Sequence, residues 1–240
     1  DQEPMLIAYL GEFRRSNPDN MTVLSIIASL HSRRGDHTMA VDVLEQGLKQ
    51  SATWVNGYTA LASNYRADNN YKAAIASLER GLVVLPDSRV LKMLLASSHE
   101  KYGDKSRAVQ LYEEVLKIDP DHQVVINNLA SLLTDEFESP ENIRRAVKLT
   151  ERFADSEQPY FIDTYAWALI KSGSPELAEP LLARATKMAP AIAVFHYHRG
   201  VGLSRMGRQS DAKKALMLAR EKASADESLQ TQISEALIDL

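Results

Sequence analysis

An all-α fold of stacked antiparallel helix pairs is predicted by three observations. Apolar residues recur at helical spacing, small residues recur with a period of 34, and Gly and Pro recur at fixed positions between the segments. A 34-residue period suits a helix-turn-helix unit, which buries its apolar face only against neighbouring units. We therefore expect one repeat array over residues 1–240.

Six units are in register, at residues 21–54, 55–88, 89–122, 123–158, 159–192 and 193–226. Positions 8 and 20 of the regular units hold small residues, which let helix axes approach closely. These residues are Ala28 and Ala40, Ala62 and Ala74, Ala96 and Ala108, Ala166 and Ala178, and Gly200 and Ala212. Breakers follow the helices, with Pro86, Pro120 and Pro190 at position 32 and Gly35, Gly103, Gly173 and Gly207 at position 15.

The two ends differ from the regular units. Residues 4–20 are predicted to be the second helix of an incomplete repeat, with Pro18 at position 32 and helical spacing of Met5, Leu6, Tyr9, Leu10 and Phe13. This helix would leave apolar surface bare, to be covered by further repeats upstream or by a second copy of the chain in end-to-end self-association. Residues 227–240 are predicted to form a capping helix with an apolar stripe of Leu229, Ile233, Leu237 and Leu240.

The fourth unit carries an insertion between its helices, at residues 134–141. Ser139 is expected to cap the second helix and Pro140 to occupy its first turn, and Ser174 and Pro175 repeat this arrangement one unit later. We interpret the insertion as a longer loop; an acidic lip beside a binding groove is the alternative. Phe153 replaces a small residue at position 27, which predicts looser or rotated packing between the fourth and fifth units.

The six registered units resemble the tetratricopeptide-repeat (TPR) family, and the resemblance covers residues 4–226. It implies a right-handed superhelix, a TPR solenoid, in which the first helices line a concave face and the second helices a convex one. It further implies a non-enzymatic scaffold that binds a protein or peptide partner in the concave groove.

The resemblance assigns positions 2, 5, 6, 9, 12 and 13 to the concave face. The early units supply small or hydroxylated groups there, such as Thr22, Ser25, Ser29 and Asn56. The later units supply the predicted partner-binding residues, which are Asn127, Asn128, Tyr160, Asp163, Thr164, Trp167, Tyr197 and His198.

Tyr and Trp offer a large contact area, and Asn can satisfy the backbone of an extended peptide. The alternative is that Trp167 and Tyr160 only pack the inner row of helices. Under the binding interpretation, replacing Trp167 and Tyr197 by Ala weakens partner binding and leaves melting nearly unchanged.

No catalytic, cofactor-binding or metal-binding residues are predicted. Cysteine is absent. His31 and His99 share position 11, where the family packs a tyrosine, so we interpret them as core residues. His196 and His198 are two apart, a spacing that points them to different faces of a helix.

Composition excludes two further classes. Hydrophobic residues make up 45% and charged residues 25%, as in folded proteins, and the net charge is −4. Neither half of the chain has more basic than acidic residues, so a nucleic-acid partner is not expected. No apolar run is long enough to span a membrane.

Residues 123–240 also resemble the closing repeats of bacterial TPR lipoproteins of exopolysaccharide export and PEP-CTERM protein sorting. The resemblance rests on the stretches 127–130, 163–167 and 197–198 and on the last helix. It implies a place in the bacterial periplasm or cell envelope, within an exopolysaccharide or secretion assembly. A cytoplasmic adaptor or regulator is the alternative, as is the repeat region of a larger enzyme such as a glycosyltransferase.

Overall fold

The computed structural model describes residues 3–17, 20–223 and 226–240, and this part of the chain contains helices, turns and no strand. The predicted all-α fold of helix pairs is confirmed. The chain divides into two compact units, residues 1–122 and 123–240, which meet at a predicted repeat boundary. The continuity of a single array across that boundary stays a prediction, and each unit is described by itself below.

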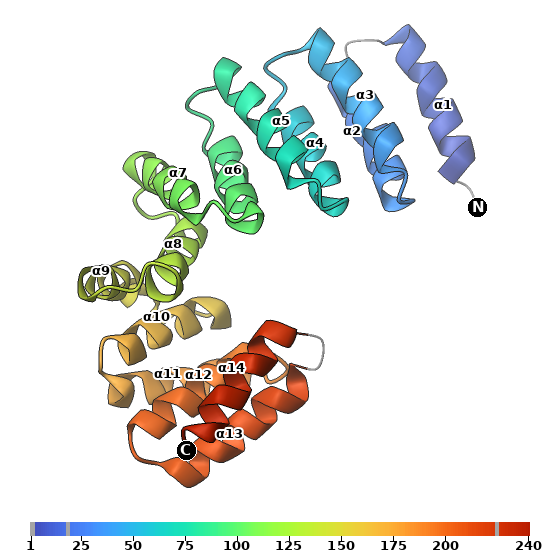
Figure 1. Cartoon of the computed structure of the whole chain (residues 1–240). Helices are drawn as coiled ribbons and strands as arrows, with labels where there is room; N and C mark the ends of the chain where they lie inside the picture. Colours follow the sequence, from blue (N-terminus) through green and yellow to red (C-terminus); the bar gives the residue numbers. More distant parts are fainter. Residues whose placement is uncertain (1–2, 18–19, 224–225) are drawn as a thin grey trace. The chain divides into compact units, whose positions relative to one another are not determined.

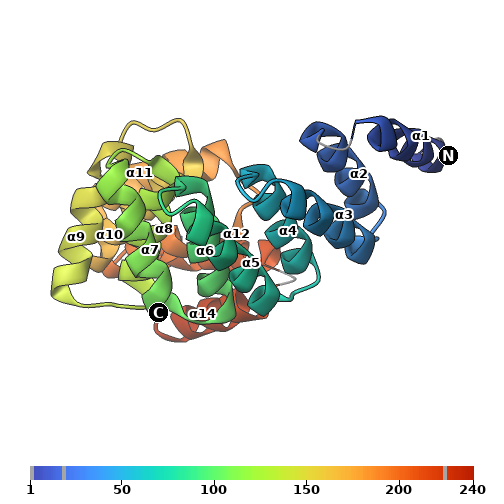
Figure 2. The ribbon, with the colours of Figure 1, turned by 90° about the horizontal axis from the view of Figure 1, so that it is seen from above.

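Unit 1 consists of one helix followed by three helix pairs (Figure 1). Its helices are α1 (Glu3–Ser16), α2 (Met21–Arg33), α3 (His37–Gln50), α4 (Val55–Ala67), α5 (Tyr71–Val84), α6 (Arg89–Tyr102) and α7 (Lys105–Ile118). Each pair packs on the next, α3 on α4 and α5 on α6, and Figure 2 shows the helices from α1 to α6 following one another in chain order.

Unit 2 also consists of helix pairs, with a closing helix at the end. Its helices are α8 (Gln123–Asp135), α9 (Pro140–Thr150), α10 (Pro159–Lys171), α11 (Pro175–Met188), α12 (Ala193–Arg205), α13 (Gln209–Lys222) and α14 (Glu227–Ile238). A 3-10 turn, Glu151–Phe153, follows α9. The first helices α8, α10 and α12 contact one another in sequence, and α14 packs against α12 and α13.

Small residues make the close contacts within the pairs, as the sequence predicts. Ala40, Ala74 and Ala108 have no exposed surface. The turns within the pairs need a left-handed residue, which Gly103 supplies at the end of α6 with φ of 104°. Asn69 takes the corresponding place after α4 with φ of 56°, a conformation that Asn tolerates better than most side chains.

The helix caps predicted in the fourth and fifth units form in the fourth unit only. Ser139 Oγ accepts a hydrogen bond from the Asn142 N–H at 3.1 Å, and Pro140 occupies the first turn of α9. Ser174 in the fifth unit makes no side-chain capping bond. Looser packing at Phe153 is wrong, because its ring is fully buried and stacks on Phe161 with 4.6 Å between the ring centres. The ring fills the space that a small residue would otherwise close, and α9 ends in the 3-10 turn that carries it. A rotated packing of the two repeats stays a prediction.

The two terminal helices differ in how much apolar surface they expose. On α1, Met5 is 75% exposed and Tyr9 is 64% exposed, so the apolar surface expected there is bare; Pro18 lies outside the described residues. On α14, Ile233 is buried against Leu216 of α13, and the rest of the predicted stripe packs on the same cluster.

In the described part of the chain, none of the helices combines the length and the apolar character that crossing a bilayer requires.

The close approach of α12 and α13 gives a test of the packing. A Cβ added to Gly200 would lie 2.6 Å from Leu216 Cγ, so we expect Gly200→Ala to lower the free energy of unfolding by about 1–3 kcal/mol. Gly11→Ala is the matched control, because a Cβ there meets nothing within 4 Å and should stabilise α1 by up to about 1 kcal/mol. Urea unfolding followed by circular dichroism measures both; equal effects of the two substitutions would contradict the packing described.

Candidate partner-binding surface

The predicted binding residues all lie on the first helices of unit 2. Asn127 and Asn128 are on α8; Tyr160, Asp163, Thr164 and Trp167 are on α10; Tyr197 and His198 are on α12. On α10 these residues are three or four apart and share one face, and Asn127 of α8 and His198 of α12 make contacts with that face. Helix packing therefore brings residues about 35 positions apart in the sequence into contact.

A chain of contacts through Trp167 connects the three helices. The Trp167 indole Nε1–H donates to Asp135 Oδ1 of α8 at 2.7 Å, and the indole stacks on the His198 ring with centres 4.0 Å apart. His198 Nδ1 is hydrogen-bonded to the Asp163 carboxylate, 2.9 Å from Oδ2 and 3.0 Å from Oδ1. Since Asp163 is buried, this hydrogen bond satisfies a carboxylate that could not otherwise remain in the interior.

Two further contacts extend this face. Thr164 Oγ1 donates to Asn127 Oδ1 at 2.8 Å, which ties α10 to α8. The Tyr160 ring meets the edge of Phe195 on α12, with ring centres 5.2 Å apart. The polar and aromatic groups are thus held in fixed rotamers by their neighbours.

Accessibility differs among the predicted residues. Tyr160 is 53% exposed, Asn127, Asn128 and Tyr197 are partly buried, and the His198 side chain is 12% exposed. Trp167 is only 8% exposed. The expectation that its removal leaves melting nearly unchanged is therefore wrong for Trp167, because most of the indole lies in the core of unit 2. The binding role of the eight residues stays a prediction.

The insertion of the fourth unit contributes two carboxylates that the sequence analysis did not assign to the site. Asp135 binds the Trp167 indole, and Glu138 Oε2 lies 2.6 Å from Lys171 Nζ. Lys171 in turn lies over the Trp167 ring, 5.2 Å from its centre. The acidic run 135–138 was the signal in the sequence, and the interpretation of this segment as an acidic lip beside a groove stays an alternative.

Tyr197 is held in a carboxylate-rich setting. Burial raises the pKa of its phenol above the ordinary value, and the nearby carboxylates of Asp135 and Glu235 raise the pKa further. The hydroxyl therefore stays protonated over the physiological range and is available as a hydrogen-bond donor.

His99 fits the core interpretation, and the His31 side chain is 12% exposed. His99 is buried, neither of its ring nitrogens has a hydrogen-bond partner in the described structure, and burial lowers its pKa. Across residues 3–17, 20–223 and 226–240, no three His, Asp or Glu side chains come together in a way that could hold a metal ion.

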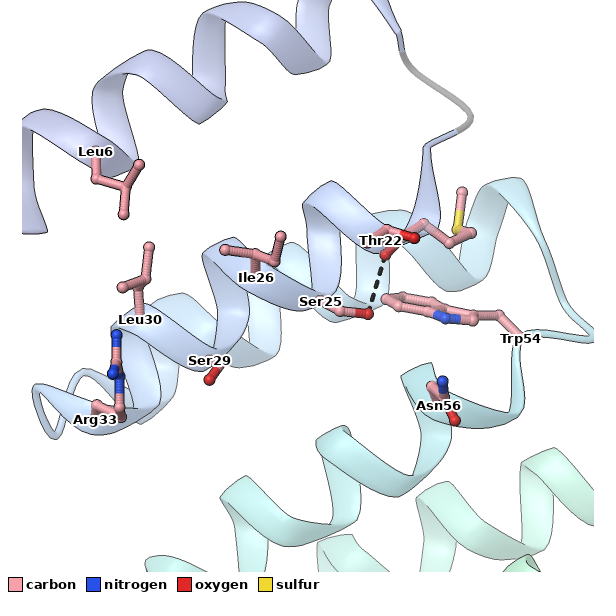
Figure 3. A pocket seen from close by; sticks show the side chains of 10 residues that line it. Leu6, Thr22, Ser25, Ile26, Ser29, Leu30, Arg33, Trp54 and Asn56 are labelled. Atoms are coloured by element: carbon pink, nitrogen blue, oxygen red, sulfur yellow. Dashed lines mark hydrogen bonds between the residues drawn. The ribbon is translucent and has the colours of Figure 1, made fainter.

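Unit 1 has a groove of its own, between α1, α2 and the start of α4 (Figure 3). Its volume is about 660 Å³. Thr22, Ser25, Ser29 and Asn56, which the sequence assigns to the concave face, line it together with Leu6, Met21, Ile26, Leu30, Arg33 and Trp54. The groove is hydroxyl-rich and has none of the aromatic stacking found in unit 2.

Comparison with known proteins identifies the repeats. Residues 59–122 match the family described as tetratricopeptide repeat. The small glutamine-rich tetratricopeptide repeat-containing protein 2 of Mycosarcoma maydis is 29% identical over 96 residues, which are 40% of this chain and 27% of that protein. The match thus spans about a quarter of the length of the curated relative.

Solved structures share the fold at low sequence identity. A chain of the APC/C hetero-tetramer Cut9-Hcn1 superposes with a TM-score of 0.72 at 9% identity, over 98% of this chain and 46% of that one. YrrB, described as a TPR protein with an unusual peptide-binding site, superposes with a TM-score of 0.50 at 17% identity, over 94% of this chain and 97% of its own.

The burial of Trp167 gives a second test. We expect Trp167→Ala to lower the free energy of unfolding of unit 2 by about 3 kcal/mol or more, because it leaves a cavity and an unused Asp135 carboxylate. Trp167→Phe keeps most of the packing and loses one hydrogen bond, a cost of about 1 kcal/mol. The exposed Tyr160→Ala serves as control and should cost less than about 1 kcal/mol. Chemical denaturation ranks the three; an Ala variant at position 167 as stable as the control would show that the indole is not a core residue.

Proposed function

This chain is a tetratricopeptide-repeat protein, and from that premise we propose that it is a scaffold that binds a peptide or protein partner on the first-helix face of unit 2. The observation that carries the proposal is the row of aromatic, amide and charged groups on α8, α10 and α12. Tyr160 presents its ring to solvent at one end of this row, with Asn127 and Asn128 on the adjoining helix.

The fixed rotamers of this face favour binding. Trp167 is anchored by Asp135 and stacks on His198, and His198 is anchored by Asp163. A surface whose side chains are already ordered loses less entropy when a partner binds, so more of the contact energy appears as affinity. The peptide-binding site named in the description of YrrB supports the same class of function for this fold.

We propose a bacterial cell-envelope setting, within an exopolysaccharide or secretion assembly, on the resemblance of residues 123–240 to the closing repeats of envelope lipoproteins. A cytoplasmic adaptor, and the repeat region of a larger enzyme such as a glycosyltransferase, are the competing assignments. They predict partners from the cytosol, or a catalytic activity in the full-length protein.

Affinity capture with the immobilised chain tests this function. Proteins retained from separate envelope and cytosolic fractions are identified, and the direct affinity of each is then measured by calorimetry. Tyr160→Ala and Asn128→Ala should each weaken the binding of the true partner by about fivefold or more, since contact residues of this kind contribute at least about 1 kcal/mol.

Tyr102→Ala is the matched control, an equally exposed tyrosine at the end of α6 in unit 1. A partner whose affinity is unchanged by both unit 2 substitutions would place the binding surface elsewhere. Enrichment from the cytosolic fraction alone would overturn the envelope assignment.

We also propose that α1 supports end-to-end self-association, because Met5, Tyr9 and Phe13 leave a continuous apolar strip on it. Light scattering should then give a mass that rises with concentration, and Met5→Lys with Tyr9→Lys should restore the monomer. A monomer at all accessible concentrations would contradict the proposed self-association.

A further inference from the structure

A hollow of about 320 Å³ lies in unit 2 between α12 and α14. Tyr197, Val201 and Arg205 line it from α12, Gln232 and Glu235 line it from α14, and Asp239 lines it from the position directly after α14. The hollow is therefore next to the partner-binding face, with Tyr197 common to both.

The repeat register explains why this space is empty. Trp167 and His198 stack on each other between α10 and α12 and fill the corresponding space there. Thirty-four residues later the same two positions hold Val201 and Gln232. The two stacked rings are replaced by a small side chain and a flexible one, so the space between α12 and α14 remains open.

The charges in the hollow also change along the register. The position held by Lys171 in α10 and by Arg205 in α12 is held by Asp239, which directly follows α14, and Glu235 lies four residues before it. Within the described residues, neither Glu235 nor Asp239 takes part in an ion pair. Arg205 is the only cation lining the hollow among those residues, and its Nη1 donates to the Ile170 carbonyl oxygen.

The chain itself shows what such a combination of groups binds. Arg80 lies 5.7 Å from the centre of the Tyr58 ring while its Nη2 contacts the Glu45 carboxylate at 2.9 and 3.0 Å. Lys171 lies over Trp167 in the same way and contacts Glu138. In both places an aromatic ring and a carboxylate hold a cation that the chain supplies.

At the hollow the ring and the carboxylates are present, and Arg205, which lines it, donates to the Ile170 carbonyl oxygen and forms no ion pair with either carboxylate in the described residues. Tyr197 supplies the ring, Glu235 and Asp239 supply the carboxylates across from it, and Asp135 adds negative charge on the α8 side. Burial raises the pKa of Tyr197, the carboxylates of Asp135 and Glu235 raise it further, and the Arg205 guanidinium lowers it.

We infer that this hollow binds an arginine or lysine side chain of a basic peptide segment in the partner. The inference rests on the proposed scaffold function and adds the chemistry of the partner. The long aliphatic stem packs on Val201 and the Tyr197 ring, and the cationic head reaches Glu235 and Asp239.

Fluorescence anisotropy with a labelled arginine-rich peptide tests the site. Peptides of the same length with glutamine or glutamate at the arginine positions are the comparison probes, and they should bind at least about tenfold more weakly because they lack the cation. Raising the salt concentration should weaken the binding of the arginine peptide, because the carboxylates are open to solvent.

Variants assign the binding to the hollow. Glu235→Gln and Asp239→Asn should each weaken the arginine peptide by about fivefold, as expected for partly exposed ion pairs. Glu227→Gln is the control, an exposed glutamate in the first turn of the same helix that does not line the hollow, and should leave the affinity unchanged. Val201→Trp should fill the space and weaken binding without lowering the melting temperature.

Equal binding of the arginine and glutamine peptides, or equal affinities of the wild type, Glu235→Gln and Asp239→Asn, would overturn the inference. The two proposals fail separately. Capture of a partner that responds to Tyr160→Ala but not to Glu235→Gln and Asp239→Asn leaves the scaffold function standing without the cation site. Arginine binding that depends on Glu235 and Asp239, with captured partners indifferent to Tyr160→Ala and Asn128→Ala, retains the cation site and rejects the first-helix face.

Discussion

The close approach of paired helices at small side chains is the contact on which the rest of the structure depends. Alanines at the two recurring positions of each pair are almost fully buried, and at Gly200 even a methyl group would meet Leu216 at 2.6 Å. At this distance, side chains elsewhere on the helices interdigitate and bury the apolar surface that a single pair could not cover. The orientation of each first helix, and with it the direction of every side chain on its face, follows from these contacts.

Because the helices pack this closely, the first-helix face of unit 2 contains both buried and exposed side chains. Trp167 reaches inward to pack and at the same time fixes His198 by stacking on it. His198 and Asp163 form a largely buried pair, which is costly to desolvate and acceptable only with good geometry. Such a pair specifies one arrangement of α10 and α12, and therefore one shape of the face that a partner would meet.

The two units use the same helix pairs for different surfaces. In unit 1 the first helices carry hydroxyl and amide groups around an open groove, whereas unit 2 fills the corresponding space with stacked rings and charged hydrogen bonds. The change arises at two positions of the register, because Trp167 stands where unit 1 has serines and His198 stands where unit 1 has apolar residues. A similar change of residue type occurs at the last helix. Glu235 on α14 stands where α12 has the apolar Val201, and Asp239, directly after α14, stands where α12 has the cation Arg205.

The sequence by itself determined the helices, their pairing and their turns. Each of these depends on local rules: the spacing of apolar residues, the small residues at fixed positions, and left-handed residues such as Gly103 that end a helix. It also identified the row of residues that the structure brings together on α8, α10 and α12. Only the tertiary structure decided that Trp167 is largely buried and that the Phe153 ring packs tightly against Phe161. It also decided that Asp135 contacts Trp167 and that Glu138 contacts Lys171. The reason is physical: these outcomes depend on the sizes and rotamers of side chains that lie more than thirty residues away along the chain or across a helix interface, and a periodic pattern carries no information about how such neighbours fill the space between them.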